Sequence, residues 1–483
     1  METQSAGWGS LHTLVALLIA AAGEVIAILF VARVSTRRAS PAATLTWIVV
    51  ILAAPWLGLL LYYLLPRSLQ MRRLRRRKER LAWIEDSLAE LLAPPGPDAQ
   101  HLGPLARLIE RLDPDSLSAG NRLQLLETGA EFFAQAAEAI AKAQHFVHFE
   151  AYIFRPDHTG RMLLRLLTEA AARGVEVRLL YDALGSWSLK RRDLAGLVAA
   201  GGKAEPCIPL LWRRRPFTFN LRNHRKLLVV DCAVAFVGGR NVGDEYAQDR
   251  FGPKRQWLDA MLRLEGPAVP RLQRVFVEDW CNATHEDLAR REYFPDVPAC
   301  GTDRVGVVAS GPDRQISGLY WVVFQLVGMA EKSIDISSPY LVPHQTLLTS
   351  LQVASGRGVR VRVHTNGPSA AHFVVYQAAR SFYRDLLDAG IELHETQGDY
   401  NHAKMVIVDD VRVFVGSPNL DMRSTDLNFE IGVVTDSPRV AADAKAMFLA
   451  RCAKGRAITL DSLSTSWPQR LLQGLARLVS PLL

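Results

Sequence analysis

The sequence contains one string of polar residues twice. In the first copy, His224 and Lys226 precede an apolar run that ends at Asp231, and Asn241 follows a second apolar run and a turn of small residues. The second copy repeats these residue types at the same spacing: His402, Lys404, Asp409 and Asn419. Surface residues at a strand end would explain one such copy. The whole string occurring twice indicates two related halves that contribute to one site.

The spacing predicts where these side chains point. Residues i and i+2 of a β-strand share a face, so each histidine should project together with its lysine. The aliphatic residues that follow, Leu227 to Val230 and Met405 to Val408, are typical of strands buried on both faces. The small residues before each asparagine let the backbone approach a bulky anion. Two copies facing one pocket would supply two imidazoles, two ammonium groups and two amides, which suits a tetrahedral phosphate.

Two imidazoles permit a division of labour in phosphoryl chemistry. A neutral imidazole can attack phosphorus, while a protonated one donates to the leaving alkoxide and later accepts a proton from the incoming alcohol. Both protonation states of histidine are accessible near neutral pH. We expect the negative charge on the non-bridging oxygens to be stabilised by Lys226, Lys404, Asn241 and Asn419.

Four carboxylates accompany the two copies. Asp259 follows the first copy and Glu430 the second, and we expect them to orient the histidines by binding the far ring nitrogen. Asp231 and Asp409 belong to the repeated catalytic motif but lie near the far end of its strand. We therefore expect them to support the motif from behind rather than to touch substrate.

The duplicated pattern resembles the phospholipase D superfamily, and the rest of the chain looks like its bacterial cardiolipin synthase branch. The matching segments are 150–154, 223–226, 236–246, 338–343, 416–424, 428–430 and 480–483. The resemblance implies two pseudo-symmetric phospholipase D-like domains that condense two phosphatidylglycerols to cardiolipin and glycerol through a phosphatidyl-histidine. It assigns the nucleophile to His224 and the general acid and base to His402, although the near-symmetric residues themselves leave this order open. No cofactor and no metal are expected.

The sequence departs from the family pattern at His344, Thr425 and Asn401. These positions bear on the preference for the head group or acceptor rather than on the chemistry. Two other functions remain open from the residues alone. A hydrolase of the same superfamily, acting on a lipid or a nucleic acid, would use water in the second half-reaction, and a membrane scaffold would not need the histidines.

Two apolar segments, at about 11–31 and 44–65, open the chain, and each is long enough at ~20 residues to cross ~30 Å of hydrocarbon. They predict a transmembrane helical hairpin within residues 1–66 and a multi-pass protein of the bacterial inner membrane. More arginines and lysines follow the second segment than lie in the loop, so the catalytic domains should be cytoplasmic. Glu24 lies inside the first segment, and we expect it to be hydrogen-bonded within the hairpin or a homo-oligomer.

The net charge of +8 is concentrated in two basic clusters. Beside membrane spans, basic residues favour an anionic lipid surface over nucleic acid as the partner. The larger cluster follows the second apolar segment and contains Arg67, Arg72, Arg73, Arg75, Arg76, Arg77, Lys78 and Arg80. The smaller contains Arg213, Arg214 and Arg215.

Strand and helix patterns alternate in both halves, which predicts an α/β fold with mixed sheets flanked by helices. A strand at 146–154 and a helix at 161–173 in the first half have counterparts at 333–338 and 345–355 in the second. After the hairpin we expect a basic helical linker at 67–120, followed by phospholipase D-like domains at 121–300 and 301–460. An amphipathic helix at 461–483 should end the chain. That helix should either lie in the membrane interface or pack on the core. The five cysteines are scattered without a Cys-x-x-Cys, which favours neither disulfides nor a metal site.

Overall fold

The computed structural model describes residues 102–208, 221–247, 255–314, 317–463 and 466–478, together with 21–32, 41–58, 87–92 and a few single positions nearer the N-terminus. The chain forms two compact units, of which one contains Met1–Arg75 and the other contains both copies of the motif. Each unit has its own cluster of buried apolar side chains.

The N-terminal unit contains two apolar helical segments. Residues 21–32 are helical, and α2 spans Pro41–Ala53. Ala27 and Phe30 of the first segment are buried in one cluster with Ile51 of α2, so the two helices pack against each other.

Among the residues that the structure describes, no helix is long and apolar enough to cross a bilayer. Both predicted spans, 11–31 and 44–65, extend into residues outside the described part of the chain. The transmembrane hairpin therefore stays a prediction.

The catalytic unit is built on two half-sheets of the same order. In the first, β2 (Phe146–Ala151) is central, parallel to β3 (Glu176–Tyr181) and antiparallel to β6 (Leu227–Val230). In the second, β11 (Ser333–Ser337) pairs in the same way with β12 (Arg360–Asn366) and β15 (Met405–Val408). Each half-sheet is therefore mixed.

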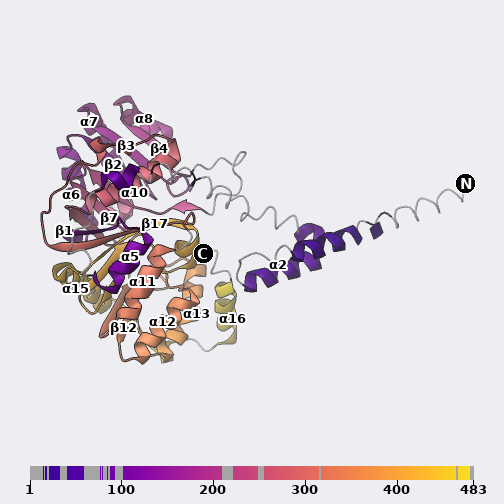
Figure 1. The fold of residues 1–483 in the computed structure, drawn as a ribbon. Coiled ribbons are helices and arrows are strands. Elements are labelled where there is room, and N and C mark those ends of the chain that lie inside the picture. The colour runs from indigo at the N-terminus through magenta and orange to yellow at the C-terminus, as the bar shows by residue number, and fades with distance from the viewer. Residues whose placement is uncertain are drawn as a thin grey trace, which may run out of the picture. The chain divides into compact units, whose positions relative to one another are not determined.

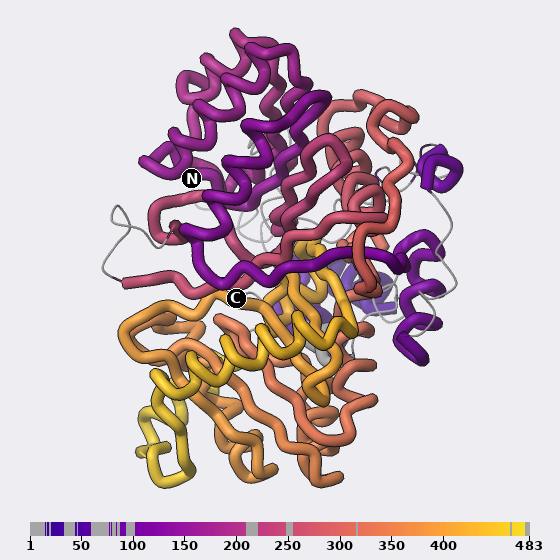
Figure 2. Tube along the Cα trace, turned by 90° about the vertical axis from the view of Figure 1, so that its left-hand side faces the viewer, coloured from indigo at the N-terminus to yellow at the C-terminus, as the bar shows by residue number. Residues whose placement is uncertain are grey.

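The outer strands complete each half. Those of the first half are β4 (Lys203–Pro206), β7 (Val234–Gly238) and β9 (Met261–Glu265). Those of the second are β13 (Glu392–Thr396), β16 (Arg412–Gly416), β17 (Asn428–Thr435) and β18 (Arg456–Ile458). β1 (Leu117–Leu126) crosses between the halves, because its first residues pair with β10 (Asp303–Ser310) and its last with β9. β10 in turn pairs with β17, so the two half-sheets are continuous (Figure 2).

Two short parallel pairs cross from one half to the other directly before each histidine. β5 (Arg222–Asn223) pairs with β17 of the second half, and β14 (Tyr400–Asn401) pairs with β8 (Trp257–Leu258) of the first. The N–H of His224 then donates to the carbonyl of Phe429, and that of His402 to the carbonyl of Leu258. Each histidine is thereby fixed to the opposite half.

Helices cover both outer faces, and two more helices share the core between the halves (Figure 1). The outer helices of the first half are α6 (Gly129–Lys142), α7 (His158–Ala172) and α8 (Arg191–Ala199). Those of the second half are α5 (Pro104–Leu112), α11 (Gly318–Met329), α12 (Gln345–Gly356) and α13 (Phe373–Asp388). The shared core contains α10 (Val269–Thr284) and α15 (Pro438–Lys454). Both faces of each sheet are thus covered, which explains why β6 and β15 are wholly buried and aliphatic. The predicted mixed sheets flanked by helices are confirmed.

Both ends of the catalytic unit contact its core. Ile84, Leu88 and Leu92, within the predicted linker, are buried in the shared core. The C-terminal helix α16 (Trp467–Leu478) lies against α13, with the guanidinium of Arg477 4.2 Å from the centre of the Phe382 ring. The helix nevertheless leaves apolar side chains exposed, namely Trp467, Leu471, Leu472, Leu475 and Leu478.

Candidate active site

Each histidine of the duplicated motif is held by a carboxylate from the opposite half. Nδ1 of His224 lies 3.0 Å from both carboxylate oxygens of Glu430. Nδ1 of His402 lies 2.5 Å from Oδ2 of Asp259. The sequence places each carboxylate after the motif of its own half and gave no sign of this exchange. With Nδ1–H donated to a carboxylate, Nε2 of each ring keeps its lone pair for chemistry.

Aromatic side chains pack around both imidazoles. The Tyr152 ring meets the edge of His224 at 4.7 Å between ring centres. Tyr246 and Trp257 lie 5.4 Å and 5.5 Å from His402 by the same measure. Both histidines are less than one-tenth exposed, and these contacts restrict the rotation of their rings.

Burial and neighbouring cations keep both imidazoles neutral at pH 7. Burial lowers the pKa of His224 to about 4 and that of His402 to about 3, against the opposing effect of the carboxylates. Lys226 and Lys404 lower both values further, so each histidine is influenced by the lysine of the other half. The two motifs therefore form one electrostatic site.

The two orienting carboxylates are ionised. Burial alone would raise their pKa, but the neighbouring imidazole and lysine outweigh this effect. The pKa of Asp259 and that of Glu430 are both lowered to about 2. Each carboxylate is thus a permanent negative charge beneath its histidine.

Both lysines are almost fully buried beside the histidines. Nζ of Lys226 donates to the carbonyl oxygen of His224 over 2.5 Å, and Nζ of Lys404 donates to that of His402. Burial lowers the pKa of Lys404 to about 8 and that of Lys226 well below its ordinary value, although Glu430 and Asp259 oppose this. The site therefore contains cations that are poorly solvated and favour an incoming anion.

The asparagines differ between the halves. Oδ1 of Asn241 accepts the N–H of Ile153 over 3.2 Å, and its Nδ2 donates to the hydroxyl of Tyr246 over 2.9 Å. Oδ1 of Asn419 has no hydrogen-bond partner among the described residues. The backbone N–H of Asn419 donates to Oγ of Ser424 over 3.1 Å. The two amides are thus equivalent in sequence but not in environment.

The preceding small residues set the position of the carboxylates. A Cβ added at Gly239 would lie 2.3 Å from Oδ1 of Asp259, so a side chain there would displace that carboxylate. In the second half the corresponding residue is Ser417, whose Oγ donates to Glu430. The longer glutamate side chain leaves room for a hydroxyl that the shorter aspartate does not.

Asp231 and Asp409 lie at the opposite end of β6 and β15 from the histidines. Asp231 accepts the N–H groups of residues 144–146 at 2.7 to 2.8 Å, and Asp409 accepts those of residues 331–333 at 2.7 to 3.2 Å. Both have positive φ, 52° and 55°, at a turn. In this structure they hold the segment before the central strand of each half and are not brought to the histidines.

Two segments of the chain, residues 137–280 and 323–452, match the family model described as cardiolipin synthase, PLD-like domain. The chain belongs to this family and is an enzyme of the phospholipase D superfamily. The cardiolipin synthase of Geobacillus thermodenitrificans is 37% identical over 423 residues, which cover 84% of this chain and 82% of the relative. Cardiolipin synthase 1 of Bacillus cereus is 33% identical over 491 residues, which cover 98% and 95%.

The fold agrees with a solved member of the superfamily. The crystal structure of phosphatidylserine synthase from Haemophilus influenzae Rd KW20 matches 78% of this chain and 100% of that chain with a TM-score of 0.60, at 16% identity. Residues 25–65 match a second family model, described as phospholipase D-nuclease N-terminal. The resemblance to the cardiolipin synthase branch is therefore confirmed.

A buried ionic cluster behind His224 was not predicted. Arg225, between the histidine and the lysine, points to the other face and pairs with Asp279 over 2.5 Å. Its Nε also donates to the carbonyl oxygen of Glu430 over 3.2 Å. The position of Arg225 in the motif was the available signal, because residue i+1 of an extended segment faces away from i and i+2.

Arg77 completes this cluster. The basic run predicts that Arg77 faces lipid, but its side chain is buried. The guanidinium lies 2.5 Å from Asp279 and 2.7 Å from Asp313, and it is 4.0 Å from the centre of the Phe429 ring. Arg77 is therefore anchored beside Phe429, the residue that precedes Glu430. Among the described residues, no group of histidine, cysteine or acidic side chains is arranged to hold a metal ion.

Proposed function

We propose that this family member is a membrane-attached phosphatidyltransferase that condenses two phosphatidylglycerols into cardiolipin and glycerol. The observation that carries the proposal is the pair of neutral imidazoles, each fixed by a carboxylate from the opposite half and flanked by a buried lysine. Relatives that match most of the chain are named cardiolipin synthases. Their names support phospholipid synthesis as the class of reaction.

In the first half-reaction, Nε2 of His224 attacks the phosphorus of one phosphatidylglycerol. The bond from phosphorus to the glycerol oxygen breaks as His402, protonated next to the anionic substrate, donates its proton to that oxygen. Glycerol leaves, and the phosphatidyl group remains on His224. The order of the two histidines follows the superfamily resemblance.

In the second half-reaction, a glycerol hydroxyl of a second phosphatidylglycerol loses its proton to Nε2 of His402. Its oxygen attacks phosphorus, the bond from phosphorus to His224 breaks, and cardiolipin is released. Lys226, Lys404 and the two motif asparagines would stabilise the charge that develops on the non-bridging oxygens. One phosphodiester replaces another, so the exchange needs no nucleotide.

The membrane attachment is assigned to residues 1–66, within which the second family match lies. We infer a hairpin in the bacterial inner membrane, with the catalytic domains on its cytoplasmic side and anionic lipids as partners. Two neighbouring apolar helices in the N-terminal unit support the hairpin. Oligomer formation and the absence of nucleic-acid binding are parts of the same proposal.

The test is product analysis with purified full-length protein in detergent and labelled phosphatidylglycerol. We expect cardiolipin and free glycerol in equal amounts, and near-complete loss with His224→Ala or His402→Ala. Mass spectrometry of acid-sensitive phosphopeptides should locate the intermediate on the peptide that contains His224. Phosphatidic acid as the main product would replace the transferase with a hydrolase. Unchanged products from both variants would refute catalysis at these histidines.

A further inference from the structure

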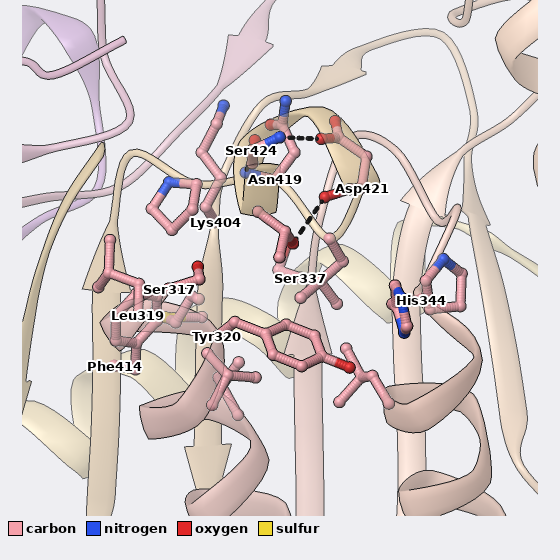
Figure 3. Close-up of a pocket in the computed structure, with 18 residues that line it drawn as sticks. Ser317, Leu319, Tyr320, Ser337, His344, Lys404, Phe414, Asn419, Asp421 and Ser424 are labelled. Carbon is pink, nitrogen blue, oxygen red and sulfur yellow. Dashed lines mark hydrogen bonds between the residues drawn. The ribbon is translucent and has the colours of Figure 1, made fainter. Parts of the chain in front are cut away.

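A narrow cavity lies beside Lys404 in the second half (Figure 3). Its volume is about 30 Å³, and it is bounded by the first residues of α11 and α12, by β15 and by the turn that contains Asn419. Its polar lining includes Ser317, Tyr320, His344, Lys404, Asn419 and Asp421. His402, Lys404 and Val406 alternate along the same face of the chain, so the cavity begins at the next same-face position beyond the histidine.

Three buried side-chain oxygens of the lining residues, those of Ser317, Tyr320 and Asn419, lack hydrogen-bond partners among the described residues. Oδ1 of Asn419 and Oγ of Ser317 are inaccessible to solvent and make no hydrogen bond to the described residues. A buried polar atom without a partner costs about 1–3 kcal/mol. Oδ1 of Asn419 can only accept, so its partner must donate a hydrogen bond, as a hydroxyl group does.

The equivalent asparagine of the first half, Asn241, has different hydrogen-bond partners. The residue five positions after Asn241 is Tyr246, which accepts a hydrogen bond from the Asn241 amide over 2.9 Å. The residue five positions after Asn419 is Ser424, which bonds the backbone N–H rather than the amide. In the first half the N–H of Ile153 and the hydroxyl of Tyr246 together satisfy the Asn241 amide, whereas Oδ1 of Asn419 has no partner among the described residues. The duplicated site is therefore open on the side of His402.

The proposed mechanism also places the alcohol on the side of the second half. The leaving and the attacking alcohol both lie opposite the nucleophile in an in-line displacement, so with His224 as nucleophile both lie on the side of the second half. A volume of about 30 Å³ corresponds to about two water molecules. This matches the two hydroxyl oxygens of a vicinal diol.

We propose that this cavity is the subsite for the head-group alcohol, a vicinal diol of the glycerol type, and that Ser317 and Asn419 select it. The inference rests on the proposed transferase function. The same subsite takes the glycerol that leaves the donor and the glycerol head group of the acceptor. His344 and Thr425, at which the sequence departs from the family pattern, line the same cavity.

The experiment uses the full-length enzyme running in reverse, with labelled cardiolipin as the phosphatidyl donor and free glycerol or 1-propanol as acceptor. The selectivity is the ratio of kcat/KM for glycerol to that for 1-propanol, which lacks the second and third hydroxyl groups. We expect Ser317→Ala to lower this ratio about five- to tenfold, the loss of one hydrogen bond. We expect Ser424→Tyr, which inserts the first-half residue, to block glycerol and to raise hydrolysis to phosphatidic acid relative to transfer.

Ser355→Ala is the matched control, because the Ser355 hydroxyl bonds the Ala389 carbonyl elsewhere on α12. It should leave the selectivity at the parent value. Circular dichroism melts check that Ser424→Tyr is folded, and Ser317→Ala provides an independent result if it is not. If the parent enzyme makes cardiolipin but both cavity variants keep its selectivity, the subsite is wrong and the transferase stands. If the parent enzyme makes no cardiolipin, both proposals fall.

Discussion

Replacing Asp259 by asparagine tests whether a carboxylate from the opposite half stabilises the charged form of His402 in the proposed reaction. Asp259 is fully buried, lies 2.5 Å from Nδ1 of His402 and carries a full negative charge, since its pKa is about 2. Asparagine has nearly the same shape and keeps an acceptor oxygen, but it removes the charge. His402 must be an imidazolium when it donates its proton in the proposed first half-reaction, so the variant should lose the stabilisation of that cation.

The size of the loss follows from Coulomb's law. Two unit charges about 4 Å apart interact by about 4 kcal/mol at the effective dielectric constant of about 20 that suits such sites. A loss of about 3–4 kcal/mol lowers a rate by about 10²- to 10³-fold. We therefore expect kcat for cardiolipin formation to fall by this factor, with the fold intact.

The pH profile gives a readout that a general loss of structure would not produce. The parent kcat, which reports the substrate complex in which His402 is protonated, should fall at acid pH as His224 is protonated and above about pH 8 as Lys404 loses its charge. Asp259 is the largest of the charges that raise the pKa of Lys404. Asp259→Asn should therefore move the alkaline limb to lower pH.

The assay is cardiolipin formation from labelled phosphatidylglycerol in mixed micelles between pH 4 and pH 9.5. Asp409→Asn is the control, because the carboxylate of Asp409 lies at the far end of β15 and, among the described residues, binds backbone N–H groups. It should lower the thermal midpoint but leave both limbs of the profile in place. An Asp259→Asn enzyme within threefold of the parent, with an unmoved alkaline limb, would refute the reasoning.

Three further predictions follow from buried contacts. Gly239→Ala places a Cβ 2.3 Å from a carboxylate oxygen of Asp259, and we expect kcat to fall at least tenfold with little change in the thermal midpoint. Arg77→Met leaves the Asp279 carboxylate with one buried cation fewer, and we expect urea unfolding to show a loss of about 3–5 kcal/mol. His148 is fully buried with its pKa lowered to about 3, so the unfolded chain binds its proton first and stability should fall as the pH drops from about 6.5 towards 3. His148→Gln should flatten that decline in melts recorded at successive pH values.

The sequence predicted the parts of this site that depend on local periodicity. The apolar run after His402 identified β15, and the alternation of His402 and Lys404 placed their side chains on one face. The strand predicted at 333–338 and the helix predicted at 345–355 agree with β11 and α12 for the same reason. Hydrophobic patterns show which faces of an element are covered.

Contacts between side chains of different halves could not be predicted from the periodicity of the sequence. The sequence placed Glu430 near the motif of its own half, whereas the short pairing of β5 with β17 delivers it to His224. Periodicity gives the face of a strand but not the strand that packs against it. Arg77 illustrates the same limit, because an arginine in a basic run has the same sequence signal whether it meets lipid or the buried carboxylate of Asp279.

The exchange of carboxylates explains why the duplicated halves have to act as one unit. Glu430 is fully buried and ionised, and its low pKa depends chiefly on His224 and Lys226 of the first half. If the halves separated, that carboxylate would lose the imidazole and the ammonium group that hold its pKa low, and as long as it stayed buried its pKa would rise in favour of the neutral acid. The neutral acid could not stabilise an imidazolium, and His224 would lose its fixed tautomer at the same time. Assembly of the halves and activation of the histidines are therefore a single event, and the asymmetry required by a nucleophile and an acid arises from small differences such as Gly239 against Ser417.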